Sequence, residues 1–173
     1  MTTKYIPTIH TRILALDPTT KGLAYAILEK VPPVRLVDWG VKNFHGIKSM
    51  RYEGLGLVED LLDRYGPDVL ALEDYGDDWR RTRKTRNLVE AIALAAKKRR
   101  IKVCRFSREE VQATFAEVDA VTKEEIANAI TTIFPELIPR LPRPRETWRT
   151  EDYGMNIFDA VALGATGIRE NCL

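Results

Sequence analysis

The stretch Arg12-Ile-Leu-Ala-Leu-Asp17-Pro-Thr-Thr-Lys-Gly22 is a short apolar run that ends in a carboxylate and leads directly into turn-forming residues. The apolar run predicts a buried strand over residues 12–17, and the Pro, Thr and Gly residues after it predict a tight turn. Strands are also predicted over residues 23–29 and 34–44, separated by a Pro-Pro pair. Because connections this short join antiparallel neighbours, we expect these three strands to form a meander.

Downstream of the meander, the apolar pattern alternates between helix and strand. Helical spacing predicts helices over residues 47–65 and 85–100, and each is followed by a short apolar strand, over residues 68–73 and 101–106. The order three strands, helix, strand, helix, strand therefore predicts an α/β fold with a mixed or parallel sheet.

The last third of the chain is predicted to be helical. Ser107 with Glu110, and Thr122 with Glu125, match the capping box that begins a helix. The proline- and arginine-rich residues 135–144 have no periodicity and are predicted to form a loop. A final helix is predicted over about residues 151–169.

Length and composition set the class of protein. The chain has 173 residues with 45% hydrophobic residues, so we expect a single folded domain over residues 1–173 and exclude disorder as its main state. The 27 Lys and Arg residues against 25 Asp and Glu residues leave a formal charge of only +2. Bulk charge therefore gives no strong indication of a polyanionic partner.

Two cysteines, Cys104 and Cys172, provide neither a disulfide framework nor the spacing of a zinc site. The first ten residues contain no apolar signal core, and the longest apolar run, residues 91–96, is too short to span a bilayer. We therefore expect a cytoplasmic protein in a reducing compartment, with no membrane association.

Carboxylates stand at the ends of two predicted inner strands. Asp17 ends the first and Glu73 ends the fourth, so a mixed or parallel sheet would place both acids in one cleft. The last helix adds Asp152, Asn156 and Asp159 at positions i, i+4 and i+7, which share one helical face. If that face packs toward the strand ends, three or four oxygen ligands converge there.

Such a cluster is unfavourable for stability because carboxylates at close range repel one another. A hard divalent cation removes the conflict, and oxygen-only ligands select Mg²⁺ or Mn²⁺ over zinc. Two ions about 3.5–4 Å apart could activate a water and stabilise the leaving oxygen of a phosphodiester.

Each of these residues also has an ordinary structural explanation. Asp17 could be a turn residue bonding to backbone N–H groups, Glu73 a solvated strand end, and Asp152 a favourable acid in the first turn of a helix. Asp159 is the sharper case, because it lies within the apolar run of residues 157–163, where an unpaired carboxylate is costly.

Taken together, Ile13-Leu-Ala-Leu-Asp17-Pro-Thr-Thr-Lys-Gly22, the strand ending at Glu73, and Asn156-Ile-Phe-Asp159-Ala-Val-Ala-Leu resemble the RuvC family of Holliday-junction resolvases. The resemblance implies an RNase H-like fold, in which three antiparallel strands and then two parallel strands form a mixed five-stranded sheet with helices on both faces. It also implies a metal-dependent endonuclease that resolves four-way DNA junctions in recombination and repair. Asp17, Glu73 and Asp159 match catalytic acids of the family.

At one ligand position the chain departs from the family pattern, with Asn156 in place of an aspartate. An Asn carbonyl can bind a metal but supplies no charge and no base, and Asp152 one turn earlier could compensate. Weaker binding of a second metal, a preference for Mn²⁺ and loss of cleavage are all open. The family also places a lysine in an A-x-K-x-x-[VI] segment, which the residues around Lys123 resemble. The resemblance therefore makes Lys123 a candidate to approach the scissile phosphate. A solvated lysine in the first turn of a helix is the alternative.

Basic and aromatic residues stand between Glu73 and the helix predicted next along the chain. We expect nucleic-acid contacts from one set of residues in this predicted strand-to-helix loop: Tyr75, Arg80, Arg81, Arg83, Lys84 and Arg86. A solvated charged loop is the alternative, and the arm over residues 140–149 is a second candidate for DNA contact.

Symmetric cleavage of a junction needs two active sites, so the resemblance implies a homodimer with branched DNA as partner and no small-molecule substrate. The apolar face of residues 88–96 could serve as the dimer interface or as core.

Other functions fit part of the pattern. A YqgF-type nuclease acting on RNA would share the fold and the carboxylates, and a junction-binding protein with little or no cleavage is consistent with Asn156. The turn from Asp17 to Gly22 also resembles the first phosphate loop of sugar kinases and actin-like ATPases, but those proteins need two such domains and 173 residues provide one.

Overall fold

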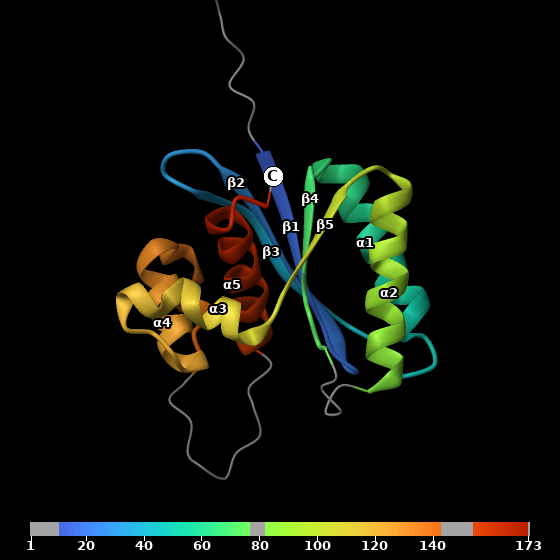
Figure 1. Cartoon of the computed structure of the whole chain (residues 1–173). Helices are drawn as coiled ribbons and strands as arrows, with labels where there is room; N and C mark the ends of the chain where they lie inside the picture. The colour runs from blue at the N-terminus through green and yellow to red at the C-terminus, as the bar shows by residue number, and fades with distance from the viewer. Residues whose placement is uncertain (1–10, 77–81, 143–153, 173) are drawn as a thin grey trace, which may run out of the picture.

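A central five-stranded sheet organises the protein, as a computed structural model shows for residues 11–76, 82–142 and 154–172 (Figure 1). The strand order is β3-β2-β1-β4-β5, with β1, β2 and β3 antiparallel and with β4 and β5 parallel to β1. The strands are β1 (Thr11–Pro18), β2 (Gly22–Lys30), β3 (Arg35–Asn43), β4 (Val69–Glu73) and β5 (Lys102–Phe106). The predicted α/β fold, with three antiparallel strands and then two parallel ones, is confirmed.

Helices cover both faces of this sheet, as predicted (Figure 1). One face packs against α1 (Met50–Tyr65) and α2 (Arg83–Lys98). The other packs against α5 (Met155–Arg169), with α3 (Arg108–Phe115) and α4 (Lys123–Ile133) lying outside α5. The connections include two 3-10 helices, η1 (Ala116–Val118) and η2 (Pro135–Arg140).

Strand periodicity decides which face each β1 side chain meets. Leu14 and Leu16 belong to the core against α1 and α2, whereas Ile13 and Ala15 pack toward α5. Because successive side chains point to opposite faces, Asp17 faces α5. The same alternation along β4 places Glu73 on the α5 side.

Small residues let α5 lie close to the sheet. A Cβ atom added at Gly164 would stand 2.4 Å from Cδ1 of Leu28 and 3.3 Å from Cβ of Ala15, so even one methyl group would force Leu28 to move. Leu28 is fully buried and has little freedom to do so. The close approach holds α5, which carries Asn156 and Asp159 in its first turns, against the sheet.

Both predicted capping boxes are present. The side chain of Ser107 accepts from the Glu110 N–H and that of Thr122 from the Glu125 N–H, while each glutamate accepts from the backbone of its capping residue. These backbone N–H donors hold the pKa of the Glu125 carboxyl below its usual range. The start of α4 is therefore fixed by several hydrogen bonds.

The predicted loop over residues 135–144 is wrong in its first part. Residues Pro135–Arg140 form η2, and Leu137 is fully buried in the core beside α4 and α5. Proline is accepted in the first turn of a helix but cannot continue a preceding one, so Pro135 follows the end of α4 and begins η2. Helix boundaries also differ by a few residues, since α1 begins at Met50 and α2 at Arg83.

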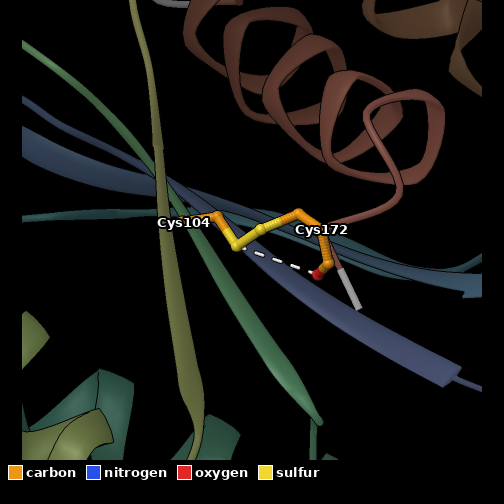
Figure 2. Close-up of a disulfide and its surroundings, with 2 residues drawn as sticks. All are labelled: Cys104 and Cys172. Carbon is orange, nitrogen blue, oxygen red and sulfur yellow. Dashed lines mark hydrogen bonds between the residues drawn. A yellow bond between two sulfur atoms is a disulfide. The ribbon is translucent and has the colours of Figure 1, made fainter.

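The two cysteines are paired, which the sequence pattern did not indicate. A disulfide joins Cys104 on β5 to Cys172 after α5, with Cα atoms 6.5 Å apart (Figure 2). The bond attaches the end of the described chain to the edge strand of the sheet. Within the described segments, no helix is both long and apolar enough to cross a membrane.

Candidate active site

The adjacent ends of β1 and β4 bring Asp17 and Glu73 together. The two strands are parallel and in register, with Leu16 opposite Leu72, so the next residue of each strand lies at the same edge of the sheet. Asp17 is only 2% exposed, and both carboxylates face α5. The predicted meeting of two acids at the strand ends is confirmed in the backbone register.

Helix α5 adds two polar side chains to the same place. Asn156 and Asp159 stand three residues apart on one face of its first turns, while their neighbours Ile157 and Phe158 are buried in the core. Asn156 and Asp159 line one cavity of about 930 Å³ together with Asp17 and Glu73. The shared helical face and its approach to the strand ends are therefore as expected.

Lys123 is the first residue of α4 and reaches this cavity from the far side of α5. Its Nζ donates to Oδ2 of Asp159 at 2.8 Å, and both side chains are about one-third exposed or less, at 33% and 27%. Because the pair is partly screened from solvent, the ammonium group offsets part of the negative charge of the cavity.

Charge in the cavity is predominantly negative. The described lining contains five carboxylates, Asp17, Glu73, Asp74, Glu109 and Asp159, and two cations, Arg108 and Lys123. Excess carboxylates in a partly enclosed space repel one another, so this arrangement favours binding of a cationic group.

Each predicted ligand would bind a metal through an oxygen atom, and oxygen ligands suit Mg²⁺ or Mn²⁺. Among the described residues, however, no group of three acidic, His or Cys side chains is close enough to form an assembled metal site. The predicted ligands fit a hard divalent cation because they offer oxygen atoms and line one cavity. In this structure Asp159 forms an ion pair with Lys123. Asp152, the predicted compensating ligand, lies outside the described residues.

The predicted nucleic-acid residues separate into two groups. Tyr75 lines the cavity, and its hydroxyl donates to the carbonyl of Pro18 at 3.5 Å, which connects the loops after β4 and β1. Arg83, Lys84 and Arg86 belong to the first turns of α2 and do not line the cavity. The prediction that Arg83 and Lys84 lie in the loop before the helix is wrong, because the Thr82 side chain caps α2 by accepting from the Thr85 N–H. Arg80 and Arg81 lie outside the described residues.

Helix α3 supplies a wall that the sequence prediction missed. Arg108, Glu109 and Gln112 line the cavity from its first turns. The signal was available in the sequence, because Ser107-Arg-Glu-Glu repeats the residue types of Thr122-Lys-Glu-Glu. The apolar face of α2, an alternative dimer surface, is instead core: Leu88, Ile92 and Ala96 are buried against the sheet.

No family model and no curated protein sequence matches the chain. Solved structures do match it in three dimensions. RuvC from Thermus thermophilus in complex with a Holliday junction substrate aligns with a TM-score of 0.70 at 19% identity, covering 94% of this chain and 96% of that one.

Two further resolvases give the same result. The yeast mitochondrial Holliday junction resolvase Ydc2 aligns with a TM-score of 0.61 at 18% identity, covering 94% of this chain and 79% of its own. The fowlpox virus resolvase in complex with junction DNA aligns with a TM-score of 0.51 at 15% identity, covering 94% and 100%. Sheet order, helix placement and these alignments agree that the chain has the RNase H-like fold of the RuvC resolvases.

Proposed function

We propose that the protein is a metal-dependent endonuclease that resolves four-way DNA junctions by phosphodiester hydrolysis. The observation that carries the proposal is the single cavity that collects Asp17, Glu73, Asn156 and Asp159 from three separate elements, with Lys123 paired to Asp159. The likeness to resolvases in fold supports it.

Mg²⁺ or Mn²⁺ would be held by the carboxylates of Asp17, Glu73 and Asp159, with the Asn156 carbonyl as a neutral ligand. When bound, such an ion lowers the pKa of a coordinated water and stabilises charge on phosphate oxygens. Asp17, almost fully buried at a strand end, has little freedom to move and would orient this ligand set.

Lys123 would act on the substrate directly. Its ammonium group lies at the rim of the carboxylate cluster, at hydrogen-bond distance from Asp159. A cation in this position can donate to a non-bridging oxygen of the scissile phosphate as negative charge develops there. Tyr75, at the same cavity, offers an aromatic face to an unstacked base.

Symmetric cleavage requires two such cavities, so we propose a homodimer acting on branched DNA, in recombination or repair and in the cytoplasm. Neither a membrane nor a small-molecule substrate is part of the proposal.

Cleavage of a labelled four-way junction tests this function. The comparison substrates are linear duplex and an RNA–DNA hybrid, each with Mg²⁺, Mn²⁺ or EDTA, and the variants are Asp17→Asn and Glu73→Gln. We expect paired symmetric cuts in the junction that require metal and both carboxylates. Full activity in both variants would refute the site, and cuts confined to RNA would move the protein to the RNA-processing nucleases.

A second candidate function is junction binding without cleavage. The observation that favours it is Asn156 on the cavity wall, where an aspartate would add charge for a metal. It predicts tight junction binding and no cuts in either metal, so the same experiment distinguishes the two functions.

A further inference from the structure

Two helices on the far wall of the cavity begin in the same way. Helix α3 starts with Ser107-Arg108-Glu109-Glu110 and α4 with Thr122-Lys123-Glu124-Glu125. In each, a hydroxyl residue and the second glutamate form a complete capping box, and the first helical residue is a cation. Arg108 is therefore the positional equivalent of Lys123.

Both cations line the same cavity as Asp17, Glu73 and Asp159. The two helix starts are also connected, because Nε2 of Gln112 on α3 donates to the carbonyl of Val121 at 3.1 Å, and the Val121 N–H donates to Glu125 at 2.9 Å. The wall that carries Arg108 and Lys123 is thus assembled before any ligand binds.

Arg108 is not explained by the stability of the fold. A positive charge in the first turn of a helix opposes the helix dipole, and Glu109 with Glu110 already provides the favourable acids. Within the described residues, Arg108 has no ion pair, whereas two other arginines close to α3 do: Arg105 pairs with Glu90 at 2.8 Å and Arg169 with Glu117 at 2.6 Å. The Arg108 side chain is exposed at the cavity rim.

The cavity needs such a cation if its ligand is an anion. Five carboxylates in the described lining repel a phosphodiester backbone, and a divalent ion would offset that repulsion only near the ion itself. A guanidinium group can contact a phosphate through two parallel hydrogen bonds, which a lysine cannot do.

We propose that Arg108 binds a backbone phosphate next to the scissile one and so sets the path of the nucleic-acid strand across the cavity. The inference rests on the proposed function for the identity of the strand. It assigns Lys123 and Arg108 to neighbouring phosphates of one strand, held by two equivalent helix starts.

The test compares Arg108→Ala and Arg108→Lys with the matched control Arg51→Ala. Arg51 is an exposed cation in the first turn of α1, on the other face of the sheet. Junction binding is measured by fluorescence anisotropy in EDTA over a range of salt concentrations. We expect Arg108→Ala to weaken binding about tenfold and to reduce the slope of log K against log salt by about 0.9, the loss of one phosphate contact. We expect Arg108→Lys to retain part of the affinity, and the control to bind as wild type does.

Phosphate neutralisation then locates the contact. Junctions that carry one methylphosphonate at each position around the cut are bound to wild type and to Arg108→Ala. We expect one position next to the cut to weaken wild type but not the variant. Equal effects of every methylphosphonate on both proteins, or wild-type affinity and slope in Arg108→Ala, would overturn the inference.

Folding and the proposed function are controlled separately. Arg108→Ala should unfold at the wild-type temperature or above, because it removes an unfavourable charge from the helix start. If wild type shows no preference for junctions over duplex, the proposed substrate fails. The comparison of Arg108→Ala with wild type on duplex then still decides the inference.

Discussion

Two buried carboxylates at opposite ends of the β1–β2 pair differ in their surroundings. Glu29 is 3% exposed and forms ion pairs with both Arg12 and Arg35, and hydrogen bonds from Arg35 and then Arg12 hold its pKa below the usual range. Asp17 is 2% exposed but faces a cavity shared with Glu73 and Asp159.

Under the proposed function, this difference separates a structural acid, Glu29, from a functional one, Asp17. Burying a carboxylate is costly, and the fold offsets the cost at Glu29 with two guanidinium groups from adjacent strands. Asp17 instead shares its cavity with the carboxylates of Glu73 and Asp159, and like charges that share a cavity repel one another. A site that is less stable as folded than it could be is the expected signature of a ligand site.

The largest expected effect is on catalysis at the cavity. Asp17→Asn should reduce metal-dependent junction cleavage at least about 10³-fold, because the proposed metal ion would lose the most deeply buried of its carboxylate ligands. The exposed Asp60→Asn on α1 is the control and should cleave normally. Activity of Asp17→Asn within tenfold of wild type would mean that Asp17, like Glu29, is structural.

The reverse result is expected at the other end of the pair. Glu29→Gln should lower the free energy of unfolding by about 2 kcal/mol at pH 7, through lost charged hydrogen bonds to Arg12 and Arg35, while cleavage per folded molecule stays unchanged. Denaturant unfolding measures the free energy of unfolding. Cleavage rates divided by the concentration of folded protein measure the activity per folded molecule.

The pH dependence of the stabilisation by Glu29 follows from the lowered pKa of its carboxyl group. The stabilisation is fully present above the unfolded value of about 4.3 and is lost as pH falls through the folded pKa. The stability difference between wild type and Glu29→Gln should therefore shrink as pH falls below about 4. A difference that is constant from pH 7 to pH 3 would disagree with the ion-pair explanation.

A smaller effect is expected from the cation beside Asp159. Lys123→Gln should slow cleavage about 10²-fold, as expected when one charged donor to the transition state is removed, and should change junction affinity much less. Single-turnover rates and anisotropy measure the two, with Lys97→Gln at the exposed end of α2 as control. Equal losses in rate and affinity would assign Lys123 to substrate binding alone.

The smallest expected effect comes from adding one negative charge to the cavity. Asn156→Asp should lower the Mn²⁺ or Mg²⁺ concentration for half-maximal cleavage roughly threefold, because affinity for these ions rises with the charge of the ligands. Metal titrations of cleavage measure this change. An unchanged midpoint would mean that residue 156 does not contact the ion.

Most of the fold was predictable because residues 13–16 of β1 and 69–72 of β4 are apolar, almost completely buried and followed directly by a carboxylate. Asp17 and Glu73 were predicted to lie together because each ends an inner strand, and adjacent strand ends of a mixed or parallel sheet meet at one edge. The capping boxes at Ser107 and Thr122 are local signals and were also identified correctly.

The errors concern contacts between distant segments. η2 is held by burial of Leu137 in the core cluster that residues of α4 and α5 share, and the pairing of Cys104 with Cys172 depends on where α5 ends relative to β5. The repeated helix start at Ser107 and Thr122 is visible in the sequence, but the position of Arg108 on the cavity wall depends on how α3 packs against α5.

Thermal unfolding of wild type and Asp17→Asn, with EDTA and then with increasing Mn²⁺, tests most directly whether the Asp17 cavity is built for a ligand. We predict that without metal Asp17→Asn unfolds at the wild-type temperature or above, and that Mn²⁺ stabilises wild type but not the variant. The account would be contradicted if Asp17→Asn were destabilised in EDTA as strongly as Glu29→Gln, and if Mn²⁺ stabilised both proteins equally.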